Sequence, residues 1–164
     1  MTDIKNSAIA GIVFGVLFGT FLGLFFDIKT GIIFGLISGL IFGVTIYLFI
    51  TSKTVKKQTQ IAITEDTEII HSGGANHLKN GEGVGGKLYL LKDNLQFKSH
   101  QFNVQNHSLS IDLKDITEIS FYNSLGIIPN GLIVHTSNGI HEKFVVNGRR
   151  IWKEEIEKHI KVVK

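Results

Sequence analysis

The stretches AGIVFGVLFGTFLGLFF (residues 10–26) and GIIFGLISGLIFGVTIYLFI (residues 31–50) place a glycine at every fourth position within long apolar runs. Neither stretch contains a charged residue, and the first run extends back to Ala8 without one. At about 1.5 Å per residue, each run is long enough to cross the ~30 Å hydrocarbon core of a bilayer as one helix. The sequence therefore predicts a membrane protein with two transmembrane helices, over about 8–26 and 31–50.

The glycine spacing predicts how these two helices pack. Missing side chains let a second backbone come close, and rows of small residues are typical of helix crossings in lipid. The link over residues 27–30 is too short to join distant helices, which predicts an antiparallel hairpin with the two rows packed against each other. The predicted helix-packing residues are Gly11, Gly15, Gly19, Gly23, Gly31, Gly35, Gly39 and Gly43.

A competing hypothesis gives the same rows a role between chains. In this alternative, a glycine-zipper oligomer forms a channel or an assembly core that the soluble domain regulates. Ion and proton pathways usually need ionisable groups at membrane depth, and neither run contains one. Thr20, Ser38 and Thr45 lie inside the runs, but their hydroxyls can bond to backbone carbonyls of their own helix. We therefore expect the hairpin, and the oligomer remains the alternative.

The charges that flank the runs predict the orientation in the membrane. Cytoplasmic segments carry an excess of Lys and Arg. Lysines outside the runs, on the side of the two termini, are Lys5, Lys53, Lys56 and Lys57. We expect a multi-pass protein of the cell membrane with both termini cytoplasmic, built from a hairpin over 1–52, a juxtamembrane linker over 53–63 and a soluble domain over 64–164. The polar residues 51–60 could alternatively form a helix that continues out of the bilayer. A signal peptide fits residues 1–26 poorly, because the apolar run is too long and lacks a small-residue cleavage site.

The soluble part alternates apolar and polar residues with period two, which predicts half-buried strands. The candidate strands lie at 88–90, 95–97, 109–113, 116–121, 132–136 and 142–146. The pair Asn138-Gly139 is the kind that a tight hairpin needs. The period then changes to that of an amphipathic helix that Asn147 can cap. Its predicted inner face consists of Trp152, Ile156, His159 and Ile160. Six or seven antiparallel strands closed by one terminal helix describe a mainly-β barrel of the pleckstrin-homology (PH) type.

Several segments of this part resemble a known family. The segments are Gly73–His77, Val84–Leu90, Leu95–His100, Asn123–Gly131 and Phe144–Asn147. Together they are similar to bacterial GRAM domains, a branch of the PH superfold, and the similarity covers roughly residues 64–160 without the hairpin. The resemblance implies the barrel fold and a non-catalytic role at membranes through lipid or protein contacts. Asn94 stands where relatives commonly carry Arg or Lys, so a shared basic contact at that turn is not implied.

The glycine-rich segment GEGVGGK (residues 81–87) superficially matches a dinucleotide fingerprint and most of a phosphate loop. Both motifs need a helix amino terminus directly after the glycines, whereas residues 87–91 have a strand pattern. Leu88 also replaces the Ser or Thr that would bind magnesium. We expect a flexible loop between the first strands and no cofactor.

Basic residues and apolar loop residues are the candidates for contact with lipid or a protein partner. PH folds that bind phosphoinositides usually gather several basic residues in the first loop, and the few cations here disfavour specific binding of that kind. Exposed apolar loops often mark contact surfaces, although the apolar residues near position 126 could instead fold back over the barrel end. The candidate contact residues are Lys79, Lys87, Lys98, His100, Leu125, Ile127, Ile128, Arg149 and Arg150.

Other function classes lack support in the sequence. The chain has no cysteine, and its seven histidines show none of the common zinc spacings, so we expect no metal site. We expect His77 and His100 to form structural hydrogen bonds of turns, and the alternative is that one or both line a ligand groove. Serine and histidine are adjacent at 99–100 and 107–108, but neighbours on a strand point to opposite faces, so no enzyme is predicted. The net charge of +3 is scattered, which argues against nucleic acid as a partner. The prediction is a membrane-anchored binding or scaffolding module on the cytoplasmic face.

Overall fold

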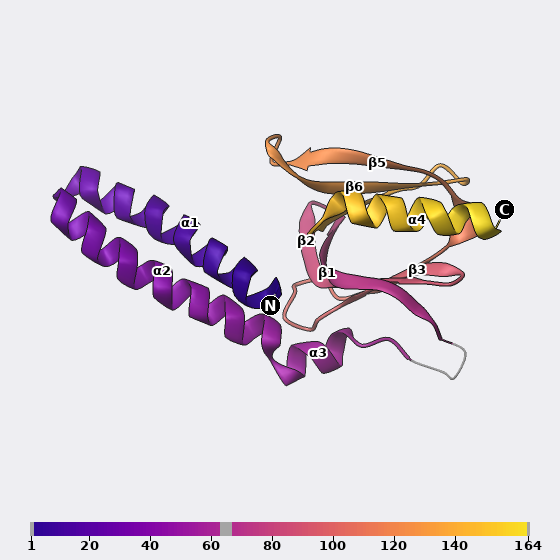
Figure 1. The fold of residues 1–164 in the computed structure, drawn as a ribbon, viewed down its shortest axis with the longest axis horizontal. Coiled ribbons are helices and arrows are strands. Elements are labelled where there is room, and N and C mark those ends of the chain that lie inside the picture. The colour runs from indigo at the N-terminus through magenta and orange to yellow at the C-terminus, as the bar shows by residue number, and fades with distance from the viewer. Residues whose placement is uncertain (1, 63–66, 164) are drawn as a thin grey trace. The chain divides into compact units, whose positions relative to one another are not determined.

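The computed structural model of the 164-residue chain describes residues 2–62 and 67–163. The chain separates into two compact units, residues 1–57 and 58–164. The first unit is helical and the second consists mainly of strands (Figure 1). The predicted domain boundary at residue 64 lies outside the described residues.

Two long helices form the first unit as a hairpin. They are α1 (Thr2–Phe25) and α2 (Ile28–Thr51), and both are longer than predicted. The turn between them is correspondingly shorter than predicted, because α2 begins directly after Asp27. The Asp27 side chain accepts a hydrogen bond from the Thr30 backbone N–H at 3.0 Å and caps the helix. By length and composition, both helices could cross a membrane.

The two glycine rows face each other inside this hairpin. A Cβ atom on Gly11 would lie 2.6 Å from the Gly39 carbonyl oxygen, and one on Gly35 would lie 2.8 Å from the Gly15 carbonyl oxygen. Gly23 is different, because its nearest cross-helix atom would be 3.9 Å away. Backbone therefore packs directly on backbone along most of the hairpin, as small residues at a helix interface allow.

Hydroxyl groups within these helices bond to their own backbone. The prediction is confirmed for two of the three hydroxyls, because Ser38 donates to the Gly35 carbonyl at 3.2 Å and Thr45 donates to the Ile41 carbonyl at 2.8 Å. The outer faces of both helices expose large apolar side chains, among them Ile12, Leu17, Leu24, Ile32, Leu36 and Leu40. The hairpin thus presents an apolar exterior.

The described residues of the second unit form seven strands, a 3₁₀ turn and a C-terminal helix, and they include the end of the short helix α3 (Lys53–Thr59). The elements are β1 (Ile69–Lys79), β2 (Glu82–Leu91), β3 (Asn94–Ser99), β4 (Ser108–Asp112), the 3₁₀ turn η1 (Leu113–Asp115), β5 (Ile116–Ser124), β6 (Ile128–Thr136), β7 (His141–Val146) and α4 (Arg149–Val163). The strands make one antiparallel sheet in the order β4-β3-β2-β1-β7-β6-β5. The sheet curves into a half-barrel that α4 covers (Figure 1).

The core lies between the concave face of the sheet and α4. It includes Leu88, Phe97, Ile119, Leu132 and Phe144 from the strands, together with Trp152, Ile156 and Ile160 from the helix. The predicted inner face of the helix is confirmed for these three residues, and His159 is half-buried beside them. The predicted cap is wrong by one residue, because α4 begins after Gly148, whose carbonyl accepts the first helical bond from the Trp152 N–H at 3.2 Å.

The predicted flexible loop over residues 81–87 is also wrong. Only Asn80 and Gly81 form the turn, and β2 begins at Glu82. Gly85 and Gly86 lie within β2, at positions where atoms of neighbouring segments leave no room for a side chain. A Cβ on Gly85 would lie 2.7 Å from Nε2 of His100, and one on Gly86 would lie 2.7 Å from the Ser99 Cα. These glycines therefore permit packing within a regular strand.

The predicted linker over 53–63 contains a short helix, α3 (Lys53–Thr59). Its last residues are bound to the half-barrel. The Tyr89 hydroxyl donates to the Thr59 carbonyl at 3.0 Å, and the Lys98 ammonium donates to the Gln60 carbonyl at 2.6 Å. The Gln101 backbone N–H donates to the Gln58 side chain at 3.0 Å. We call residues 58–60 the docked segment.

Candidate functional site

The tip of the β5–β6 hairpin carries three of the predicted contact residues. Leu125 is 87% exposed, Ile127 is 79% exposed and Ile128 is 41% exposed. The turn closes through the Gly126 N–H to the Asn123 carbonyl and the Ile127 N–H to the Ser124 carbonyl, both at 3.2 Å. These side chains face solvent, and the alternative that they fold back over the barrel end is wrong.

The two arginines at the start of α4 have different environments. Arg149 donates to the Tyr122 carbonyl at 2.7 Å and to the Asn123 side chain at 3.2 Å. Its guanidinium also lies 4.7 Å from the centre of the Phe121 ring. Arg150 is exposed. Arg149 is thus fixed next to the β5–β6 tip.

Lys153 lies one turn of α4 further on and adds a third cation beside β5. Its ammonium donates to the Ile119 carbonyl at 2.6 Å and lies 5.4 Å from the centre of the Phe121 ring. It also pairs with Glu157 at 3.3 Å. We call Arg149, Arg150 and Lys153 the cationic base of the β5–β6 hairpin.

The predicted contact residues Lys87 and Lys98 come together on the outer face of the sheet, directly opposite each other on β2 and β3. Lys87 lies 4.8 Å from the centre of the Tyr89 ring, and Lys98 bonds to the docked segment. Tyr89 is only 3% exposed, and its burial raises the pKa of its hydroxyl. Both ammonium groups thus have intramolecular partners, which offset the cost of placing like charges opposite each other.

The remaining predicted contact residues lie elsewhere. Lys79 is exposed at the end of β1, opposite Glu82. His100 begins the β3–β4 loop, where its Nδ1 accepts the Phe102 backbone N–H at 3.2 Å. Burial lowers the pKa of His100. Its hydrogen bond within the loop fits the structural role expected for it.

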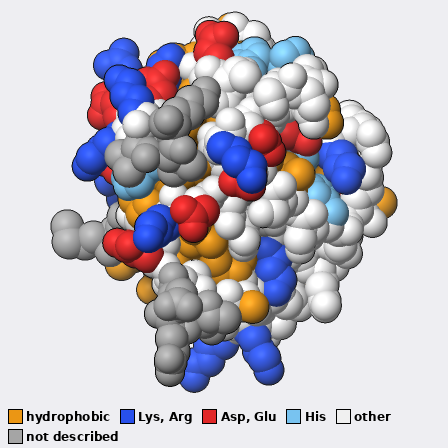
Figure 2. Space-filling model, turned by 90° about the vertical axis from the view of Figure 1, so that its right-hand side faces the viewer, with side chains coloured by type: hydrophobic (Ala, Val, Ile, Leu, Met, Phe, Trp, Pro, Cys, Tyr) orange, Lys and Arg blue, Asp and Glu red, His pale blue; other side chains and the backbone are white. Residues whose placement is uncertain are grey.

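Charge is mixed on the face of the molecule that Figure 2 shows. Lys and Arg side chains, in blue, alternate there with Asp and Glu side chains, in red. A patch of one sign would be needed for long-range attraction of a highly charged polymer. On this face the charges instead offset one another.

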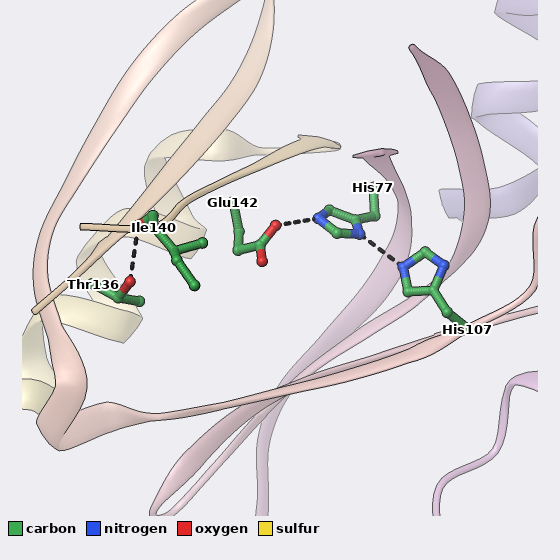
Figure 3. A network of polar contacts seen from close by, with 5 residues as sticks. All are labelled: His77, His107, Thr136, Ile140 and Glu142. Atoms are coloured by element: carbon green, nitrogen blue, oxygen red, sulfur yellow. Dashed lines mark hydrogen bonds and ion pairs between the residues drawn. The ribbon is translucent and has the colours of Figure 1, made fainter. Parts of the chain in front are cut away.

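Three side chains, His77, His107 and Glu142, form a hydrogen-bonded histidine relay that links β1, β7 and the β3–β4 loop (Figure 3). No pattern in the sequence predicted this relay. Nε2 of His77 lies 2.7 Å from a carboxylate oxygen of Glu142, and its Nδ1 lies 2.8 Å from Nε2 of His107. His77 is only 2% exposed and stacks on Phe144 at 4.7 Å between ring centres. No local spacing signals this relay, because its three members are far apart in sequence.

The chemistry of the partners determines where the protons of the relay lie. A carboxylate only accepts hydrogen bonds, so Nε2 of His77 donates to Glu142. In the uncharged imidazole, Nδ1 is then an acceptor and takes a hydrogen bond from Nε2 of His107. The remaining Nδ1 of His107 is buried and has no hydrogen-bond partner among the described residues. Burial first, and then the charge of Lys79, lowers the pKa of His107 below its ordinary value of 6.5.

These lowered pKa values predict acid sensitivity. In the folded protein, His100 and His107 remain uncharged at a pH where the unfolded chain takes up protons. The stability they contribute is therefore complete above pH 6.5 and is lost as the pH falls from 6.5 towards the lowered pKa values. We expect the free energy of unfolding to decrease over this interval, and we expect a smaller decrease in His107→Gln.

Denaturant unfolding at a series of pH values, followed by fluorescence of the single tryptophan, measures this dependence. Val104→Ala, in the same β3–β4 loop and 93% exposed, changes no titratable group; it is the matched control and should keep the wild-type pH profile. An unchanged profile in His107→Gln would show that this residue does not contribute to the acid sensitivity.

The relay lacks the parts of a hydrolytic triad. The Oγ of Ser99 is near it, but this oxygen accepts the His107 backbone N–H at 2.9 Å. Within residues 2–62 and 67–163, no group of three or more His, Asp or Glu side chains is arranged to hold a metal ion. The relay therefore joins strands and a loop by hydrogen bonds.

Comparison with known proteins gives the fold of the second unit. No protein-family model matches the sequence, and the comparison with curated proteins gives no match. The C-terminal domain of an unknown protein from Leishmania infantum has a TM-score of 0.51 at 16% identity, over 57% of this chain and 84% of that chain. The N-terminal PH domain of Vps36 also has a TM-score of 0.51 at 16% identity, over 66% of this chain and 90% of that chain. At such identities the likeness shows the fold alone, and the predicted PH-like fold is confirmed.

Proposed function

We propose that this chain is a membrane-anchored, non-catalytic binding module in which a PH-like unit of the GRAM type is held at the bilayer by the α1–α2 hairpin. The module works on the cytoplasmic face and contacts lipid or a membrane protein. The observation that carries the proposal is the covalent union of a PH-like fold with two helices of apolar exterior.

The exterior of the hairpin supports a location in lipid. Large apolar side chains such as Leu24 and Leu36 are 81% and 71% exposed. Transfer of such surface from water to hydrocarbon gains roughly 25 cal/mol per Å². The backbone of each helix is satisfied internally, which is the condition for crossing a bilayer.

Tethering explains how such a module can work with weak intrinsic binding. An anchor keeps the PH-like unit near the bilayer at an effective concentration in the millimolar range. A contact too weak to recruit a soluble protein can then be occupied much of the time. The fold and the resemblance to GRAM domains both support a binding role.

The geometry of the glycine rows weakens the competing oligomer hypothesis. Gly15, Gly31, Gly35 and Gly39 are buried against the opposite helix of the same chain. Since these surfaces are already used, they are not available to a second chain unless the hairpin opens. We therefore propose no channel or assembly core.

Thiol labelling tests the anchor and its orientation, because the native chain has no cysteine. In intact cells, a membrane-impermeant maleimide should label Phe26→Cys, in the turn between the helices. It should label Ser52→Cys only after permeabilisation. Both variants should remain in the membrane pellet after an alkaline carbonate wash, and the cysteine-free chain should take no label.

Two results would contradict the proposal. Labelling of Ser52→Cys but not of Phe26→Cys in intact cells would reverse the orientation. Release of the whole protein by the carbonate wash would remove the anchor itself.

A further inference from the structure

Two hairpin turns of the chain share a pair of positive φ values at different residues, although β1 and β2 are joined by Asn80 and Gly81 alone and β5 and β6 by the longer connection 125–127. The β1–β2 turn has Asn80 at φ 52° and Gly81 at φ 81°. The β5–β6 turn has Leu125 at φ 52° and Gly126 at φ 78°. Two successive positive φ values are the pattern of a type I′ hairpin turn, for which Asn-Gly is strongly preferred. Leucine therefore occupies the positive-φ position that asparagine fills in the β1–β2 turn.

Turn formation does not explain this leucine. A side chain with φ above zero is disfavoured for residues other than Gly, Asn and Asp. Packing does not explain it either, because Leu125 is 87% exposed, more than the other two large apolar residues of the tip. The tip accepts an unfavourable backbone conformation and displays an apolar side chain to solvent. Strain retained at such a place points to a contact outside the chain.

The distribution of charge indicates the nature of that contact. From Ile119 to Val134 the β5–β6 hairpin carries no charged residue. The cationic base lies beside its strands, where Arg149 is held against Tyr122 and Asn123. An apolar tip with arginines behind it matches the layers of an anionic membrane surface, in which acyl chains lie below phosphate groups.

We propose that the β5–β6 tip inserts Leu125 and Ile127 into the boundary between headgroups and acyl chains of an anionic bilayer, while Arg149 and Arg150 contact lipid phosphates. This inference rests on the proposed function and specifies the lipid surface as the partner of the module. A lipid surface is favoured over a protein because the proposed anchor keeps the PH-like unit at the bilayer and the arginines beside the apolar tip match the charge of anionic headgroups. The tip is also a protruding turn whose contact needs no complementary pocket. Figure 1 shows it extending past the first turn of α4.

A fluorescent probe at the tip tests the insertion in the full-length protein. Ile127→Cys is labelled with an environment-sensitive dye, and the protein is reconstituted into vesicles of phosphatidylcholine with or without phosphatidylglycerol. Nitroxide groups on the lipid acyl chains quench only dyes that enter the bilayer. The matched control is Ser137→Cys in the exposed turn that follows the other end of β6. We expect strong quenching at position 127, increased by phosphatidylglycerol, and little at position 137.

Two substitutions separate the apolar and the cationic contributions. Leu125→Asn suits the positive φ of the turn, so it removes the apolar side chain without weakening the hairpin. It should lower the ratio of inserted to free tip by about tenfold or more. Arg150→Gln should lower this ratio about fivefold in anionic vesicles alone, and Lys158→Gln, at an exposed position further along α4, should leave it unchanged.

The outcomes distinguish this inference from the proposed function. Failure of the full-length protein to float with vesicles would overturn the anchor and the insertion together. Flotation with equal quenching at positions 127 and 137 would overturn the insertion and leave the anchor standing. A dye at 127 that is shielded from aqueous iodide but is not reached by the lipid nitroxides would mean that protein covers the tip, which also overturns the inference. Unchanged insertion in Leu125→Asn would contradict the role of that residue.

Discussion

Replacement of Gly35 by alanine is expected to separate α1 from α2. The added Cβ would lie 2.8 Å from the Gly15 carbonyl oxygen and 2.9 Å from the Gly19 Cα, and neither backbone atom can move aside alone. One helix must then shift as a whole, and the close backbone contact along the row is lost. The same change at Gly23 should be tolerated, because its nearest cross-helix atom would be at 3.9 Å.

This comparison is well matched because alanine raises helix propensity by about 1 kcal/mol at either position. A difference between the two variants therefore reports packing alone. The rings of Phe14 and Phe42 stack across the hairpin at 4.4 Å between centres, so cysteines at these two positions can be joined by a short bifunctional thiol reagent. Cysteines that are already joined no longer react with a maleimide polymer. The gel shift that the polymer causes therefore measures the fraction of the protein that was not joined. We expect the joined fraction to fall several-fold in Gly35→Ala and to stay at the wild-type level in Gly23→Ala. Equal yields in both variants would mean that the glycine rows do not set the helix spacing.

The second large effect is expected from Phe144→Ala in the half-barrel. Phe144 is fully buried, stacks on His77 and contacts the ring of Phe97 at 6.0 Å between centres. Removal of a buried phenylalanine ring costs about 3–5 kcal/mol through lost transfer free energy and the cavity left behind. A domain of this size is stable by roughly 5–15 kcal/mol, so the substitution should remove a large part of the total.

Trp152 reports this loss without added labels. It is the single tryptophan of the chain and is buried on the inner face of α4, so its fluorescence follows unfolding of the half-barrel in the full-length protein in detergent. Phe102→Ala is the control, because that ring is 63% exposed and its removal should change stability by no more than about 0.5 kcal/mol. Similar unfolding midpoints for the two variants would contradict the assignment of the core.

Periodic patterns in the sequence predicted much of this fold. Alternation over 88–90 and 95–97 predicted parts of β2 and β3, and the helical period predicted the inner face of α4. The strand β1 was not predicted as a strand, because its sequence is largely polar and only Ala75 and His77 are buried in it. Its place in the sheet depends on pairing with β2 and β7, which no local pattern records.

The candidate surfaces could be predicted in part. The apolar residues at 125, 127 and 128 were predicted as contact residues from the sequence. Their exposure, however, depends on a turn that forms even though leucine has a positive φ there. The internal role of Arg149 depends on the position of α4 against β5. The histidine relay requires the register of β1 against β7 and the path of the β3–β4 loop, so it became visible only in three dimensions.

The docked segment determines where a soluble fragment of this protein can begin. A cut after residue 60 would look natural from the polar composition around it, yet it would remove the acceptors of two hydrogen bonds. Tyr89 would then lose the only partner recorded for its hydroxyl among the described residues, and an unsatisfied buried hydroxyl costs about 1–3 kcal/mol. Fragments for crystallisation or binding assays should therefore start before Gln58.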